Sequence, residues 1–127
     1  SAEAQLRLGE FYHDGMTVPQ DYTRALYWFN KAAAGGESYA MYRAASMYLA
    51  GAGTEVDEAK ALSLALAAAE HNERGGNYLA GRMYYKGWGG AVNNELAIQY
   101  LSRAIELGYN NARAELDALL MAKKDKN

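Results

Sequence analysis

Apolar residues in the chain recur at the spacing of an α-helix. Over residues 2–14, Ala4, Leu8, Phe11 and Tyr12 follow the i, i+4, i+7, i+8 pattern of one helix face. A glycine follows this stretch, and glycine readily takes the left-handed conformation that ends a helix. The pattern therefore predicts a helix over residues 2–14.

The same pattern returns when the sequence is shifted by 36 residues. Periods of this size are typical of repeat proteins. Without any gap, the shift aligns Tyr12, Tyr48 and Tyr84; Gly15, Gly51 and Gly87; Ala25, Ala61 and Ala97; and Ala32, Ala68 and Ala104. It predicts equivalent first helices over residues 38–50 and 74–86.

A second helix is expected in each unit, with alanines that allow close approach to its neighbours. The expected N-caps are Asp21, Asp57 and Asn93, because their side chains can accept a hydrogen bond from the first turn. The expected ends are Gly36, Asn72 and Gly108, which tolerate the left-handed conformation.

Together these elements predict an all-α fold, a solenoid of helix–turn–helix repeats of about 36 residues. Residues 1–127 are expected to form a single repeat domain. Its parts would be three repeats (2–36, 37–72 and 73–108), a capping helix (109–122) and a polar, frayed tail (123–127). Trp28 shares its position in the repeat with Leu64 and Tyr100 and is expected to be a large core residue.

Composition and motifs argue against catalysis and against most ligands. The formal net charge of −2 lacks the basic excess that is typical of nucleic-acid-binding proteins. The chain has no cysteine, and His13 and His71 lie at unrelated positions, so no metal site is indicated. The longest nearly apolar run, residues 61–69, is about half as long as a membrane-spanning helix. We expect no catalytic residues, no metal, no cofactor, no nucleic acid and no membrane insertion.

The first unit resembles the Sel-1-like repeat family, a relative of the tetratricopeptide repeats. The family pattern A-x-x-x-L-G-x-x-Y-x-x-G, then V-x-x-D, A-x-x-W and A-A, is matched by Ala4, Leu8, Gly9, Tyr12, Gly15, Val18, Asp21, Ala25, Trp28, Ala32 and Ala33. The resemblance covers about residues 2–122, although later units drift from the pattern. It implies a right-handed α-solenoid that serves as a non-enzymatic adaptor or scaffold, and this step from fold to function is an analogy.

The resemblance also implies that the first helices line the inner, concave wall. On a helical wheel, this wall carries four of the chain's eleven tyrosines, with acidic residues in the first unit and basic ones in the third. Tyrosine and arginine are enriched at interface hot spots, so we expect the wall to bind a peptide segment or a partner loop. The candidate residues are Glu10, His13, Tyr39, Tyr42, Tyr78, Arg82, Tyr85 and Lys86, with Arg82 and Lys86 as a clamp for an acidic group.

Several alternatives stay open. The tyrosines could instead pack between adjacent first helices and stabilise the fold by burial. The protein could be a bacterial immunity protein or inhibitor of one folded toxin, an enzyme, or a self-associating array, although a monomer is favoured. The chain begins Ser1-Ala2 without methionine, which favours a bacterial periplasmic or exported protein whose signal segment is absent from this chain.

Overall fold

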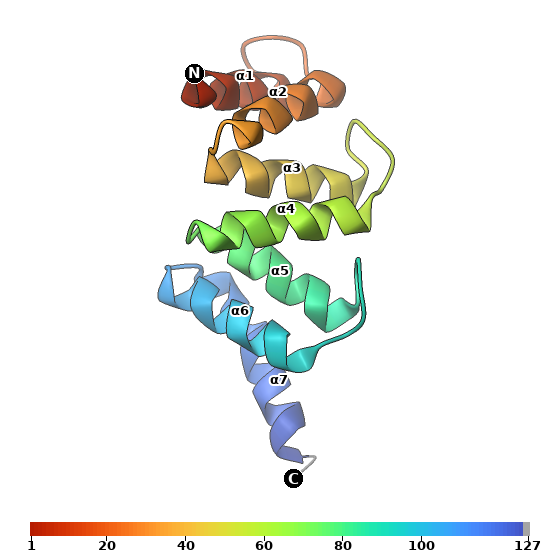
Figure 1. Cartoon of the computed structure of the whole chain (residues 1–127), viewed down its shortest axis with the longest axis vertical. Helices are drawn as coiled ribbons and strands as arrows, with labels where there is room; N and C mark the ends of the chain where they lie inside the picture. The colour runs from red at the N-terminus through yellow and green to blue at the C-terminus, as the bar shows by residue number, and fades with distance from the viewer. Residues whose placement is uncertain (126–127) are drawn as a thin grey trace.

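The chain is a stack of helical hairpins. A computed structural model describes residues 1–125, and all regular structure in that range is helical. The helices follow one another along one axis, with the two ends of the chain at opposite ends of the stack (Figure 1). Their bounds are α1 Ala2–Asp14, α2 Tyr22–Ala34, α3 Ser38–Ala50, α4 Glu58–Glu70, α5 Arg74–Lys86, α6 Asn94–Glu106, the 3-10 turn η1 Asn110–Ala112, and α7 Arg113–Asp125.

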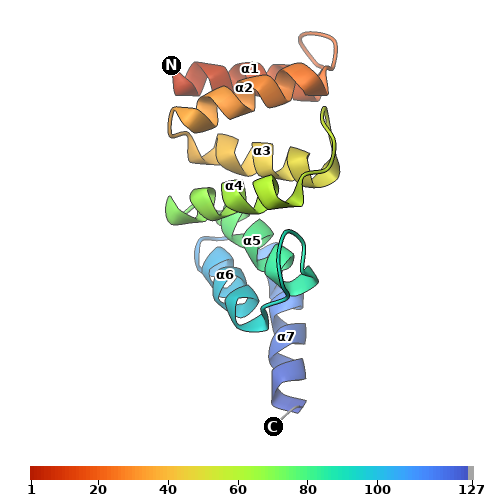
Figure 2. The ribbon, with the colours of Figure 1, turned by 45° about the vertical axis from the view of Figure 1, so that its right-hand side comes forward.

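Three hairpins, α1–α2, α3–α4 and α5–α6, form the repeats, and η1 with α7 covers the last of them. We call α1, α3 and α5 the first helices, and α2, α4 and α6 the second helices. The first helices have the bounds predicted from the sequence. The loops within the hairpins lie at one edge of the stack, and the turns between repeats lie at the other (Figures 1 and 2).

The predicted helix boundaries are confirmed by their geometry. The caps of the second helices accept backbone hydrogen bonds as expected: Asp21 from Arg24 at 3.1 Å, Asp57 from Lys60 at 3.0 Å and Asn93 from Leu96 at 3.0 Å. The residues expected to end helices have positive φ: Gly15, Gly51 and Gly87 at 68°, 71° and 74°, and Gly36, Asn72 and Gly108 at 94°, 60° and 100°.

Two of the hairpin loops dock on the preceding repeat. Gly53 has φ +75°, and a Cβ there would lie 2.5 Å from the carbonyl group of Tyr22 at the start of α2. Gly89 has φ +85°, and a Cβ there would lie 2.7 Å from the carbonyl oxygen of Glu58 at the start of α4. Glycine is therefore required at both positions. Thr17 occupies the equivalent position in the first hairpin, where residues 1–125 provide no preceding helix.

Each hairpin closes through a pair of residues whose sizes are complementary. A Cβ on Gly9 would lie 2.6 Å from the ring of Phe29, and a Cβ on Gly81 would lie 2.8 Å from the Leu101 side chain. In the second repeat the corresponding residues are Ala45 and Ala65, which are both fully buried. A large residue on the second helix thus goes with glycine on the first helix.

The prediction for Trp28 is wrong. Trp28 is only half-buried and packs edge-on against Tyr27, with ring centroids 5.1 Å apart. The large core residue of this hairpin is its neighbour Phe29, whose side chain is fully buried. One residue along a helix turns the side chain by about 100°, so the core face runs through Phe29 and leaves Trp28 at its margin.

The apolar positions of α1 indicated a packed helix face, but part of that face is exposed. Ala4 is exposed and Phe11 is 45% exposed. In the later repeats, the position of Phe11 is occupied by Met47 and Met83, which are buried in the core. Their helices pack against the second helix of the preceding repeat. Within residues 1–125, no such helix precedes α1.

The capping helix is longer than predicted. It starts as the short turn η1 and continues through Lys123 and Lys124 to Asp125, three residues beyond the expected end. Leu116 and Leu119 are its buried residues. The predicted frayed tail is therefore helical over residues 123–125, and residues 126–127 lie outside the described residues.

Candidate protein-binding face

The eight candidate residues belong to α1, α3 and α5 and define what we call the first-helix face. Besides their contacts with the second helices, α3 and α5 pack directly against each other. Six of the eight candidate residues are half-buried, and the other two, Tyr85 and Lys86, are exposed. The face is therefore neither a solvated surface nor a closed core.

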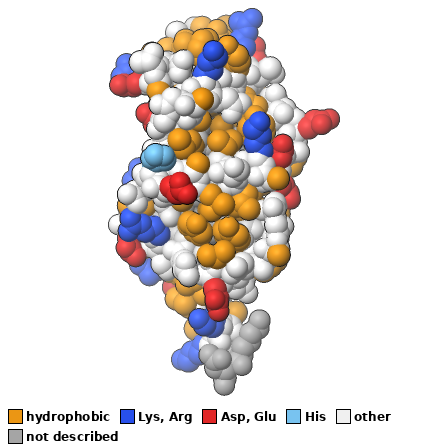
Figure 3. All heavy atoms as spheres, viewed as in Figure 1, with side chains coloured by type: hydrophobic (Ala, Val, Ile, Leu, Met, Phe, Trp, Pro, Cys, Tyr) orange, Lys and Arg blue, Asp and Glu red, His pale blue; other side chains and the backbone are white. Residues whose placement is uncertain are grey.

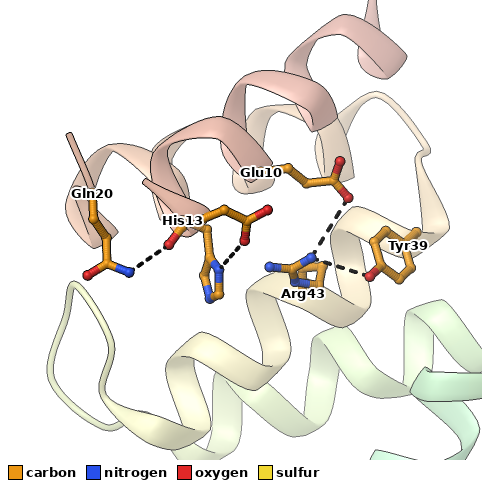
Figure 4. Close-up of polar contacts among 6 residues, drawn as sticks. Glu10, His13, Gln20, Tyr39 and Arg43 are labelled. Carbon is orange, nitrogen blue, oxygen red and sulfur yellow. Dashed lines mark hydrogen bonds and ion pairs between the residues drawn. The ribbon is translucent and has the colours of Figure 1, made fainter. Parts of the chain in front are cut away.

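A first cluster joins α1 to α3 and includes Glu10 and Tyr39 (Figure 4). Both turn toward Arg43, which sequence analysis did not select. Arg43 Nη1 lies 3.8 Å from Glu10 Oε1 and donates to the Tyr39 hydroxyl at 3.3 Å. The Arg43 guanidinium also lies 4.9 Å from the ring centroid of Phe29, and its side chain is only 17% exposed. This arrangement fastens two repeats together and leaves Arg43 little access to a partner.

His13 lies beside this cluster and is occupied locally. Its Nδ1 is 3.1 Å from the carboxylate of Asp14, and its ring is tilted against Tyr22 at 5.2 Å between centroids. Its carbonyl oxygen accepts a hydrogen bond from the Gln20 side chain at 2.9 Å, which ties the first loop to the end of α1 (Figure 4). Within residues 1–125, no group of three or more His, Cys, Asp or Glu residues is placed to hold a metal ion.

Tyrosines continue the face from α3 to the cap. Tyr39 and Tyr42 have ring centroids 5.9 Å apart. A Cβ on Gly75 would lie 2.8 Å from the Tyr42 ring, so this ring packs directly on the backbone of α5. Burial raises the pKa of Tyr42, and the neighbouring Tyr109 raises it further. Tyr109, in turn, stacks on Tyr78 with centroids 4.5 Å apart.

A second cluster joins α5 to α7 around Glu115. The Tyr78 hydroxyl donates to Glu115 Oε1 at 2.6 Å, and Arg82 Nε donates to Oε2 at 3.1 Å. Burial, followed by the hydrogen bond and the negative charge of Glu115, raises the pKa of Tyr78 to about 12. The Arg82 guanidinium lies 5.7 Å from the centroid of the Tyr78 ring and 5.5 Å from that of Trp88.

The structure therefore divides the candidates into three groups. Glu10, His13, Tyr39, Tyr42 and Tyr78 are packed or paired within the fold. Of the tyrosines, Tyr42 packs between two first helices, Tyr39 is paired within α3, and Tyr78 is paired with α7. Arg82 is paired but 35% of its side chain is exposed. Tyr85 and Lys86 are exposed, with the Lys86 ammonium 5.2 Å from the centroid of the Tyr85 ring.

Sequence analysis missed Arg43, Tyr109 and Glu115, although one signal was available. Arg82 and Glu115 are 33 residues apart, and Glu10 and Arg43 have the same separation. This is the repeat length less three residues, and it is the offset between facing positions of α1 and α3 and of α5 and α7. Opposite charges at this offset mark contacts between repeats.

The face on the other side of the stack is more apolar. Half-buried hydrophobic residues of the second helices include Leu62, Leu64, Leu66, Ile98 and Tyr100. Hydrophobic side chains gather in the middle of the surface at the level of α4 to α6 (Figure 3). This second-helix face offers an alternative surface for a partner.

Stacked helical hairpins of constant length, each closed by the same caps and core pair, define an α-solenoid of short repeats. The Sel1 repeat model matches residues 2–37, 38–73 and 76–109. The chain belongs to the Sel1 repeat family, as its first unit suggested.

Solved structures agree with this assignment. A Sel1 repeat protein from Oxalobacter formigenes superposes with a TM-score of 0.86 and 29% identity, over 91% of this chain and 48% of that one. A protective antigen present in uropathogenic Escherichia coli strains, which displays the SLR fold, gives 0.85 and 33%, over 87% and 24% of the two chains. Cysteine rich protein B of Helicobacter pylori shares the fold, with a TM-score of 0.72 and 18% identity over 91% of this chain and 96% of that one. The chain spans about half of the first of these structures and a quarter of the second.

No curated protein matches the chain. Sel1 repeat proteins generally mediate protein–protein interactions on a scaffold that is typically non-enzymatic. None of the helices in residues 1–125 is long and apolar enough to cross a membrane.

Proposed function

We propose that this chain is a non-catalytic adaptor module that binds a peptide segment or a loop of a partner protein along its first-helix face. One observation carries the proposal: tyrosine and arginine side chains follow one another from α3 across α5 to Tyr109, just before η1. The exposed Tyr85 and Lys86 lie at the C-terminal end of α5. Tyrosine and arginine supply large contact areas with a polar tip, the combination that is enriched at hot spots.

The candidate residues that are exposed lie in the third repeat. Tyr39, Tyr42 and Tyr78 form a packed floor, and the hydroxyl groups of Tyr39 and Tyr78 are already hydrogen-bonded to Arg43 and Glu115. Tyr85 and Lys86 would make contacts that do not also stabilise the fold. They are therefore better targets for a test than Tyr78 and Arg82, whose substitution would also loosen α7.

Capture from an extract of the source organism, with the chain immobilised, tests the proposal. The test variant combines Tyr85→Ser with Lys86→Glu. The second-helix face offers a matched control, Tyr27→Ser with Lys31→Glu, because Tyr27 is also exposed and Lys31 lies 5.5 Å from its ring centroid. A protein retained by the wild type and the control but not by the test variant supports the proposal. Loss in the control alone would move the site to the second-helix face.

A bacterial immunity protein or inhibitor is the main alternative within the same class. It would bind one folded protein over a large area, whereas an adaptor binds a short segment. Competition with overlapping peptides of the captured partner separates them, because a short peptide reproduces one contiguous bound segment but not the large surface of a folded protein.

A further inference from the structure

Arg43 and Arg82 both make hydrogen bonds at the first-helix face, and these hydrogen bonds differ in a way that separates the roles of the two residues. Arg43 uses Nη1, at the end of its guanidinium, for both Tyr39 and Glu10. Arg82 uses only Nε, on the side of its guanidinium, for Glu115. Within residues 1–125, Nη1 and Nη2 of Arg82 donate no hydrogen bond, while the guanidinium is ion-paired with Glu115 through Nε.

The Arg82 side chain is also held in one direction. Glu115 fixes its Nε, and the rings of Tyr78 and Trp88 lie within 5.7 and 5.5 Å of its Cζ. Both oxygens of Glu115 are used, one by Tyr78 and one by Arg82. The restraint lowers the entropy that Arg82 would lose on binding, which is the general benefit of preorganisation.

We infer that Arg82 binds a carboxylate of the partner through Nη1 and Nη2, and that Glu115 is the positioning residue that aims it. The guanidinium end presents two parallel N–H groups, a geometry that matches the two oxygens of a carboxylate. Lys86 lies one turn further along α5 and is exposed, so it adds positive charge on the same side of the helix. The ligand is therefore an aspartate, a glutamate or a terminal carboxylate within the bound segment. This inference rests on the proposed function and specifies the chemistry of its partner.

Trp88 provides a direct readout because its ring is next to Arg82. The chain has two tryptophans, so a Trp28→Phe background isolates the Trp88 fluorescence. The probe is acetylated tetraglutamate amide, and tetraglutamine amide is its neutral match. Titration with tetraglutamate should change the Trp88 emission until it saturates. The affinity should fall as the salt concentration rises, and tetraglutamine should not bind.

Variants separate binding from positioning. Arg82→Gln should weaken tetraglutamate binding by about tenfold or more, as expected for loss of charge-assisted hydrogen bonds. Arg82→Lys keeps the charge but loses the two parallel N–H groups, and it should also weaken binding. Urea unfolding of both variants checks that they remain folded. Arg24→Gln, the control, changes an exposed arginine of α2 and should leave the affinity unchanged. Glu115→Gln keeps the size of the side chain but removes one acceptor oxygen and the charge, so it should weaken binding several-fold.

Each contrary result has a defined meaning. Equal binding of tetraglutamate and tetraglutamine, or no binding of either, would overturn the carboxylate site. Unchanged or tighter binding by Glu115→Gln would overturn the positioning role, and a tighter complex would show that Glu115 competes with the ligand. The extract capture with the Tyr85 and Lys86 variant is independent of this titration. A partner captured on the first-helix face without tetraglutamate binding would refute the carboxylate site and leave the proposed function standing.

Discussion

The size complementarity inside each hairpin makes a quantitative prediction for Gly81. In an ordinary exposed helix, Gly→Ala stabilises by about 1 kcal/mol, because alanine has the higher helix propensity. Here a Cβ would lie 2.8 and 2.9 Å from the Cγ and Cδ2 atoms of Leu101. Overpacking of this kind costs about 1–3 kcal/mol, so Gly81→Ala should leave the protein no more stable, and by up to about 2 kcal/mol less stable.

The effect should reverse when Leu101 is shortened. Leu101→Ala alone should cost about 2–5 kcal/mol, since Leu101 is fully buried. In that background Gly81→Ala has room for its methyl group and reproduces the alanine pair of the second repeat, Ala45 and Ala65. It should then stabilise by about 1 kcal/mol, which gives a coupling free energy of about 1–3 kcal/mol between the two sites.

Urea unfolding followed by far-ultraviolet circular dichroism measures the free energy of unfolding of the four proteins in this cycle. A coupling near zero, with Gly81→Ala stabilising both backgrounds equally, would refute the reasoning. It would mean that the helices shift apart freely and that glycine is not needed for the close approach.

Three other predictions follow from the same geometry. Gly53→Ala should destabilise by at least about 1–2 kcal/mol because of its positive φ, whereas Thr17→Gly at the equivalent position should cost much less, as thermal unfolding would show. Met47→Ala should cost about 2–5 kcal/mol, but Phe11→Ala should cost clearly less in urea unfolding, because Phe11 is 45% exposed and Met47 only 3%. Tyr78 has a pKa of about 12, above the ordinary value of 10.0, so its contribution to stability is complete below pH 10 and is lost between about pH 10 and 12. Urea unfolding across that range should show a steeper loss in the wild type than in Tyr78→Phe.

Local signals in the sequence were sufficient for the fold. The helix ends depend on residues that act within one turn, such as the aspartate cap at Asp57 and the left-handed Gly51. The period of 36 residues then placed the equivalent elements in all three repeats. These features could be predicted because the residues that decide them are close together in the chain.

The site was harder to predict because it depends on contacts between repeats. A helical wheel shows which side chains of a first helix point away from its own hairpin. It does not show which residues of the next repeat lie opposite them. Arg82 was selected from the sequence, but its partner Glu115 lies in a capping helix that the repeat pattern describes less well. The predictions that Phe11 and Trp28 are packed were wrong for related reasons. Residues 1–125 provide no helix that covers Phe11, and a single residue separates Trp28 from the fully buried column.

The measurement that tests the central claim most directly is the affinity of the captured partner for three proteins. They are the wild type, the first-helix variant with Tyr85→Ser and Lys86→Glu, and the second-helix variant with Tyr27→Ser and Lys31→Glu. We predict that the first-helix variant binds at least about tenfold more weakly, the loss expected for a hot-spot contact, while the second-helix variant binds like the wild type. Equal affinity of the first-helix variant and the wild type would contradict the assignment of the binding face.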